Sequence, residues 1–373
     1  MTKKWLRWTP AAIVPAVIAV GVLAVPLQAG AVDLPDKSAA EVLAMIGQEQ
    51  VDALSGTVEQ TSALGLPDLG STGMSGGGAD GAADASTDAA ASALELLSGS
   101  HTARVYFDGP AKARVQVLDR LAERDVVVNG SEIWFYDSDR NAAQHVVLPA
   151  DAGAADAATE GKVPGGVRTP AELANKLLAG LDASTEVTVG QDVEVAGRSA
   201  YEIVLTPKTS ESLVGSIAIA VDSETGLPLR FTVQARGQSE PAFQVVLTNL
   251  SLDTPNADLF DFAPPAGATV EEIAIPAHDA SGAEVPKGEA LPERSPTAPG
   301  NLTVTGSGWD AVAEVTGAAV PSELEASPLF SQLTTPVDGG RLFSTALMNV
   351  YLTDDGRAFA GSVSLERLQA AAQ

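Results

Sequence analysis

Short stretches in which apolar and polar residues alternate constrain the fold of this chain more than any other feature. Such alternation places the apolar side chains on one face of a β-strand. In the segment 112–119, the polar Lys112, Arg114 and Gln116 alternate with the apolar Ala113, Val115 and Val117. Turn sequences such as Asn129-Gly130 separate these stretches, and no strand–helix–strand repeat occurs. The sequence therefore predicts an antiparallel sheet. Its strands are expected at 54–62, 101–108, 112–119, 123–128, 132–137, 141–148, 185–195, 200–207, 213–222, 229–235 and 242–251.

Two amphipathic helices are predicted beside these strands. Ser38 and Glu41 have the spacing of a capping box, in which each side chain satisfies a backbone N–H of the first turn. Thr169-Pro170, followed by Glu172, gives the same start signal with proline at the first helical position. A shorter helix is predicted over 90–97. The apolar faces of the two main helices comprise Ala39, Val42, Leu43 and Ile46, and Leu173, Leu177, Leu178 and Leu181.

The first 31 residues resemble an export signal. Lys3, Lys4 and Arg7 precede a run without charge from residue 9 to residue 32. Ala29 and Ala31 have the small-x-small spacing that signal peptidase cleaves, so we expect cleavage after Ala31. The alternative is an uncleaved membrane anchor formed by residues 9–31, because that run approaches the ~20 residues that span a bilayer. Either case places the remainder of the chain outside the cytoplasm.

Composition excludes several classes of function. The chain has no cysteine, so it holds no disulfide, zinc–thiolate site or thiol nucleophile. Asp and Glu number 48 against 22 Lys and Arg, a net charge of -26 that repels nucleic acid and anionic membranes. The three histidines lie far apart in sequence, which argues against a multi-histidine metal site. Glu271 and Glu272 are adjacent carboxylates, and such a pair is typical of a solvated turn. We therefore expect a non-enzymatic protein with no metal, no cofactor and no nucleic-acid partner.

Changes in composition divide the chain into domains. Residues 32–275 contain the predicted sheet, with a Gly/Ala/Ser/Asp-rich flexible insertion at 65–91 and a polar loop at 149–168. Residues 276–300 hold several prolines and predict an extended linker. Residues 301–373 then form a small C-terminal α+β domain. Its strands are expected at 301–316, 341–352 and 357–363, and its helix at 365–372.

One face of the predicted sheet is apolar along its whole length. Two or three helices are few to cover so large a face, so it either packs into a solid core or encloses an apolar cavity. The residues alone leave these alternatives open. The residues assigned to this face, and to a cavity if one exists, are Val105, Phe107, Val115, Val117, Val126, Val128, Ile133, Phe135, Ile203, Leu205, Ile217, Ile219, Phe231, Val233, Val245 and Leu247.

Four segments resemble the LolA family of lipoprotein carriers. Residues 126–137, VVVNGSEIWFYD, are similar to its "D-G-x-x-x-W-x-Y-D-P" strand pair, with Asn129 in place of the usual Asp and Ser138 in place of the usual Pro. Residues 205–208, LTPK, match its "L-x-P-K" strand end, and 225–230, TGLPLR, its turn into a strand. Residues 249–252, followed by LFDFAPPAG at 259–267, resemble its terminal "F-x-F-x-P-P-x-G" signature.

This resemblance implies an incomplete antiparallel β-barrel, closed by a helical lid, with a hydrophobic cavity for acyl chains. It implies no catalytic residue. It favours an exported carrier whose ligand is a lipid or an acylated lipoprotein. Relatives similar to MucB and RseB pair this fold with a smaller C-terminal domain and control an anti-sigma factor. The alternative function is therefore an extracytoplasmic regulator with a membrane-protein partner. A structural envelope protein with a solid core is the third possibility.

Overall fold

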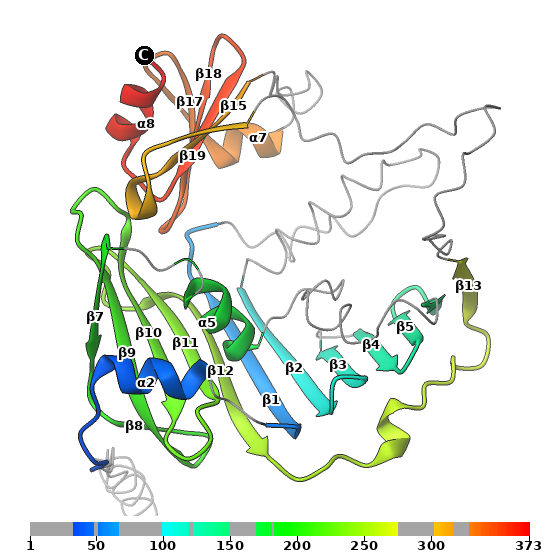
Figure 1. Ribbon diagram of the computed structural model, residues 1–373. Coiled ribbons are helices and arrows are strands. Elements are labelled where there is room, and N and C mark those ends of the chain that lie inside the picture. Colours follow the sequence, from blue (N-terminus) through cyan, green and yellow to red (C-terminus); the bar gives the residue numbers. More distant parts are fainter. Residues whose placement is uncertain are drawn as a thin grey trace, which may run out of the picture.

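The computed structural model of the protein contains two β-sheets, one above the other in Figure 1. It describes residues 33–47, 51–66, 99–118, 122–148, 169–178, 180, 183–274, 302–316 and 328–373. The export signal with Ala29 and Ala31, the helix at 90–97, the loop at 149–168 and the linker at 276–300 lie outside these residues, as does nearly all of the insertion at 65–91. The predictions for those segments, and the domain boundaries that depend on them, stay predictions.

The first sheet has 13 strands and is open, with β13 and β7 at its two edges. From edge to edge the strands run β13-β6-β5-β4-β3-β2-β1-β12-β11-β10-β9-β7, and β8 pairs with β9. Every strand predicted between 54 and 251 has its counterpart, with 185–195 divided into β7 and β8. The strands are β1 (Ala53–Ser62), β2 (Gly99–Asp108), β3 (Lys112–Leu118), β4 (Glu123–Asn129), β5 (Glu132–Asp137), β6 (Ala142–Val147), β7 (Thr185–Val189), β8 (Val193–Val195), β9 (Arg198–Pro207), β10 (Val214–Asp222), β11 (Pro228–Ala235), β12 (Pro241–Ser251) and β13 (Thr269–Ala274).

The antiparallel prediction is confirmed for all strand pairs of this sheet except β13 with β6, which is parallel. Adjacent carboxylates predicted a solvated turn at Glu271-Glu272, and this prediction is wrong. Both residues lie in β13, where Glu271 accepts a hydrogen bond from Gln144 at 3.1 Å and Glu272 lies 2.8 Å from His145 Nδ1. An edge strand leaves its side chains in water, so charged residues are compatible with it.

Helices α2 (Ala39–Gly47) and α5 (Pro170–Leu178) lie over the part of the sheet formed by β9–β12 (Figure 1). The predicted capping box of α2 is present: Ser38 N–H donates to Glu41 Oε2 at 2.8 Å, and Glu41 N–H donates to Ser38 Oγ at 3.3 Å. Val42 and Ile46 of α2 and Ala174 of α5 are buried against the strands in one hydrophobic core. The helices thus cover the end of the sheet near β7.

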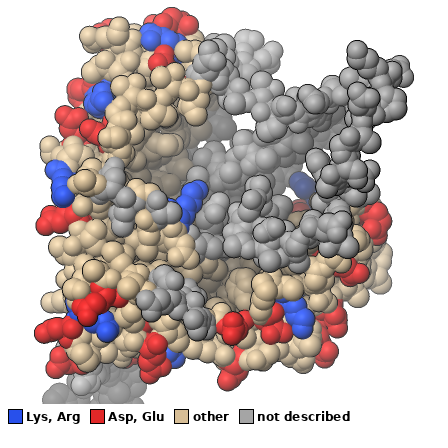
Figure 2. Space-filling view, viewed as in Figure 1, with Lys and Arg blue, Asp and Glu red and all other residues tan. Residues whose placement is uncertain are grey.

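The opposite face of β3 and β4 carries polar contacts instead. Arg114 forms an ion pair with the buried carboxylate of Asp125 and donates to the main-chain oxygen of Leu259 at 3.0 Å. Leu259 belongs to the short 3-10 helix η3 (Ala257–Phe260), which leads towards β13. Aspartate and glutamate side chains are distributed over the visible described surface, with lysine and arginine dispersed among them (Figure 2).

The turn between β4 and β5 lies one residue later than the sequence predicted. Asn129 still pairs with Glu132, so the two turn residues are Gly130 and Ser131. Gly130 has φ +62°, and a glycine at the first central position is typical of a type II′ hairpin turn.

The second sheet has six strands in the order β14-β15-β19-β18-β17-β16. Its core is formed by Val312, Tyr351, Phe359, Val363 and Leu368, the last from the C-terminal helix α8. The predicted strands at 301–316 and 341–352 are each divided in two, and α7 and β16 were not predicted. The elements are β14 (Leu302–Thr305), η4 (Gly308–Asp310), β15 (Val312–Thr316), α7 (Pro328–Leu333), β16 (Thr334–Val337), β17 (Gly340–Ser344), β18 (Asn349–Thr353), β19 (Arg357–Gly361) and α8 (Leu365–Ala371).

The two sheets contact each other through backbone and side-chain groups. Leu213 N–H donates to the main-chain oxygen of Ser362 at 2.7 Å, beside an isolated bridge between Ser212 and Val363. Ala346 N–H donates to the main-chain oxygen of Leu64, just beyond the end of β1, at 2.9 Å. The second sheet is therefore joined to the first at more than one place.

Candidate ligand pocket

A cavity of about 410 Å³ lies between the first turn of α5 and the covered face of the first sheet. Its lining comes from α5 and the residue before it, from β1 and the two residues before it, from β2 and the turn after it, from β12, and from the start of β11 with the residue before it. The lining residues are Val51, Asp52, Leu54, Val105, Phe107, Gly109, Pro110, Thr169, Pro170, Ala171, Leu227, Pro228 and Leu247.

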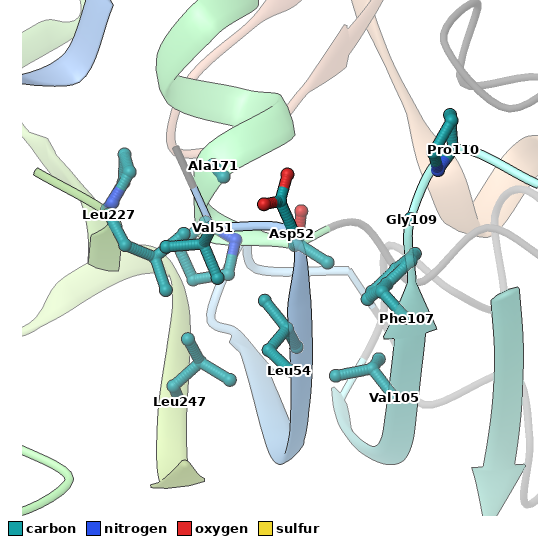
Figure 3. A pocket seen from close by; sticks show the side chains of 13 residues that line it. Val51, Asp52, Leu54, Val105, Phe107, Gly109, Pro110, Ala171, Leu227 and Leu247 are labelled. Carbon is teal, nitrogen blue, oxygen red and sulfur yellow. The ribbon is translucent and has the colours of Figure 1, made fainter. Parts of the chain in front are cut away.

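Apolar side chains from three neighbouring strands form the floor of this pocket. Leu54 of β1 pairs in register with Phe107 of β2, and Leu247 of β12 pairs with Val58 of β1. Figure 3 shows Leu54, Val105, Phe107 and Leu247 gathered below α5, with Ala171 on the helix above them. The short side chain of Ala171 leaves the space between helix and sheet unfilled. The pocket can thus hold an apolar group by removing it from water.

The mouth of the pocket is marked by Asp52 and Pro110, the two lining residues whose side chains are exposed. The main-chain oxygen of Asp52 accepts a hydrogen bond from Gly109 N–H at 2.7 Å. This bond fixes the start of β1 against the end of β2. The mouth therefore has a defined shape, although its side chains face water.

The strand register extends the pocket floor across the same face of the sheet. Starting from Phe107, the residues in register are Ala113 of β3, Val128 of β4, Ile133 of β5, Val146 of β6 and Ile273 of β13. Six strand spacings of ~4.8 Å separate β1 from β13, about 29 Å in all. A second row joins Val105, Val115, Val126 and Phe135. An apolar surface thus continues from the pocket to the β13 edge.

Three of the predicted cavity residues, Val105, Phe107 and Leu247, line the pocket itself. Six more lie on the apolar surface that continues from it: Val115, Val117, Val126, Val128, Ile133 and Phe135. Whether these residues contact a ligand stays a prediction.

The remaining predicted residues lie where the helices cover the sheet. Side chains of α2 and α5 fill the space over them. Trp309 of η4 and Leu347, in the connection between β17 and β18, pack against the same core. Val245 is fully buried in the adjoining core beneath the pocket. The structure thus contains both alternatives that the sequence left open, a solid core at one end of the face and a cavity beside it. The residues in the solid core are Ile203, Leu205, Ile217, Ile219, Phe231 and Val233.

Sequence reasoning missed Leu54, Leu227 and Ala171 as pocket residues. Leu54 shares the alternation of β1, and parity could have assigned it to the inner face. Ala171 and Leu227 have no comparable signal, because their role depends on where α5 lies over the strands. Asp52 was also missed, since a single aspartate before a strand carries no sequence signature.

No group of three or more metal-ligating side chains is found among the described residues. His145 stacks on Trp134 with ring centroids 4.0 Å apart, and its partner Glu272 belongs to the neighbouring edge strand. This arrangement holds β13 against β6 and presents no nucleophile. None of the described helices combines the length and the apolar character needed to cross a membrane.

Residues 81–274 match a family model described as "Predicted periplasmic protein (DUF2092)". This match covers most of the first sheet, including every strand of the pocket floor except β1. The chain belongs to this family. The family description agrees with the extracytoplasmic location that the N-terminal segment predicts. No curated protein matches the chain in sequence.

Several solved structures are similar to this DUF2092 protein at low sequence identity. In the complex of MucA and MucB from Pseudomonas aeruginosa, the matching chain is 17% identical, with 90% of this chain and 96% of that chain covered and a TM-score of 0.39. The LolA superfamily protein NE2245 from Nitrosomonas europaea is 10% identical, with coverage of 61% and 99% and a TM-score of 0.24. An uncharacterized conserved protein from Thermus thermophilus is 12% identical, with coverage of 63% and 99% and a TM-score of 0.33.

Proposed function

We propose that this protein is a non-enzymatic binding protein of the cell envelope that holds an acyl chain in the pocket beneath α5. The observation that carries this proposal is the cavity of about 410 Å³ with a floor of Leu54, Val105, Phe107 and Leu247. Pockets for small ligands have volumes of about 300–1,000 Å³ and mostly apolar walls. The ligand is a lipid or the acyl group of a lipoprotein, and the role is that of a carrier.

Simple energetics support an acyl chain as the occupant. Each buried methylene contributes ~0.8 kcal/mol, so about ten methylenes contribute ~8 kcal/mol before the costs of association are subtracted. A polar metabolite would gain little from these walls, because the described lining offers few hydrogen-bonding side chains. The exposed mouth at Asp52 and Pro110 lets the chain enter tail first while its head group stays in water.

A second candidate function is the regulator with a membrane-protein partner. It is favoured by the contact between Ala346 of the second sheet and Leu64 of the first. Leu64 follows β1, the strand that contributes Leu54 to the pocket floor. A ligand that shifts β1 would therefore move the second sheet through this contact. A partner bound to the second sheet would then respond to ligand binding. A partner whose binding requires residues 302–373 and changes with lipid occupancy would distinguish regulator from carrier.

The pocket assignment is tested by filling the cavity. Ala171→Phe places a ring between α5 and the pocket floor, whereas Lys176→Phe places the same ring on an exposed position that points away from Ala171 around the same helix. Titration with a fluorescent fatty acid should show at least a tenfold loss of affinity for Ala171→Phe and none for Lys176→Phe. Circular dichroism should show both variants folded. A folded Ala171→Phe that binds like the wild type would overturn the assignment.

A further inference from the structure

Asp52 is the one ionisable residue among the 13 described residues that line the pocket. Its side chain is exposed, and aspartate contributes a formal negative charge. Figure 3 shows the carboxylate directed away from Leu54 and Phe107, on the side of the pocket where α5 begins. Its backbone is held by Gly109 at 2.7 Å. A fixed negative charge thus stands at the mouth of an apolar pocket.

The basic side chains of the neighbouring strands do not neutralise this charge. Arg104, Lys112 and Arg114 alternate onto the opposite face of the sheet from Val105 and Phe107. Lys112 is paired there with Asp108 at 3.2 Å, and Arg114 is paired with Asp125.

One arginine of β4, Arg124, does share the face of the pocket floor. It lies in the row of Ala103 and Val117, two rows from Phe107, or ~13 Å along the strands. Asp137 is its register partner on β5 and supplies an opposite charge. Of these charged groups, Asp52 is the one that belongs to the pocket.

We infer that Asp52 selects the head group of the bound amphiphile, favouring an ammonium or uncharged head over an anionic one on the same alkyl chain. This inference rests on the proposed binding of an acyl chain in the pocket. A ligand whose tail fills the pocket places its head at the mouth, beside Asp52. Because the head remains partly solvated, the charge changes affinity by about tenfold or less.

Displacement of a neutral apolar fluorescent probe from the full-length protein tests this inference. Dodecylammonium, dodecanol and dodecanoate are compared below their micelle concentrations, in about 0.15 M salt, where charges more than ~8 Å away are largely screened. The wild type should prefer dodecylammonium to dodecanoate by about tenfold. Asp52→Asn should reduce that ratio to below about threefold, and Asp52→Lys should reverse the preference.

Asp108→Asn is the matched control, because it changes the net charge by the same unit on the opposite face of the sheet. Its ratio should remain that of the wild type. An unchanged ratio in Asp52→Asn, or an equal fall in Asp108→Asn, would overturn the role of Asp52. Should dodecanol and the probe fail to bind the wild type at all, the proposed function fails instead, so the two failures are distinguishable.

Discussion

Trp309 of η4, between β14 and β15 of the second sheet, donates its indole Nε1–H to the hydroxyl of Thr185, at the start of β7, across a distance of 2.8 Å. Thr185 is buried, and the Trp309 ring packs against the same core as Val42 and Ile46 of α2. The second sheet therefore supplies part of the hydrophobic core of the first. The proline-rich linker suggests from sequence that the N-terminal domain is independent. Such a domain would lack the packing of Trp309 against its core.

We expect Trp309→Ala to destabilise the first sheet by about 2 kcal/mol, because a partly buried indole and its hydrogen bond are both lost. Trp309→Phe, which keeps most of the packing, should cost about 1 kcal/mol. Urea unfolding measures both changes. A fragment ending at residue 274 that is as stable as the full-length protein would show that the contact contributes nothing.

Ile219 and Ala218 are neighbours in β10 that face opposite sides of the sheet. Ile219 is fully buried in the core beneath the helices, whereas Ala218 is half-buried between Val204 and Thr232 on the other face. Ile219→Glu should cost several kcal/mol, since it buries a charge without a partner. Ala218→Glu should cost less than about 1 kcal/mol. Thermal melts followed by circular dichroism compare them, and equal losses would contradict the assigned parity.

Gly226, in the turn between β10 and β11, packs closely against the main chain of α2. Its φ is +80°, and a Cβ there would collide with the main-chain carbonyl of Met45. Gly237 has φ +78° but no atom within 4 Å of the corresponding position. Gly237→Ala should therefore cost only the backbone strain of ~1 kcal/mol, and Gly226→Ala at least about 1 kcal/mol more. Equal losses of unfolding free energy for the two variants, measured by chemical denaturation, would contradict the close contact between α2 and this turn.

Asp222 makes the stability of the first sheet depend on pH. Burial acts to raise its pKa, but hydrogen bonds from Arg198 and Thr225 outweigh burial, and the pKa is lowered. A lowered pKa in the folded state stabilises the protein above the unfolded value of ~3.9, and this stabilisation is lost as pH falls through the folded value. Asp222→Asn should therefore cost most at neutral pH and progressively less below about pH 4. A cost that stays constant down to about pH 3, measured by urea unfolding, would contradict this.

Local alternation was sufficient to predict β1–β12, because each of these strands has one face turned towards apolar side chains. It failed for β13, whose TVEEIA sequence is exposed on an edge and whose parallel pairing with β6 depends on a connection through η3. It also failed for α7 and β16, which follow residues 317–327 and have few large apolar side chains at a regular spacing.

The pocket could be predicted in part, because the alternation within a strand also assigns each side chain to one face of the sheet. Parity correctly placed Val105, Phe107 and Leu247 on the inner face. Parity alone could not show that α2, α5 and Trp309 fill the space over Ile219 and leave it open over Phe107. That difference depends on the position of α5 relative to β1, which no local sequence pattern encodes.

Native mass spectrometry of the protein purified from its own cell envelope, with lipid extraction from the same sample, tests the central claim most directly. The wild type should carry extra mass that the extract identifies as an acyl-chain compound, and Ala171→Phe should carry much less. Wild-type protein that has the mass of the bare chain, with no acyl-chain compound in the extract, would contradict the proposal that this protein holds an acyl chain beneath α5.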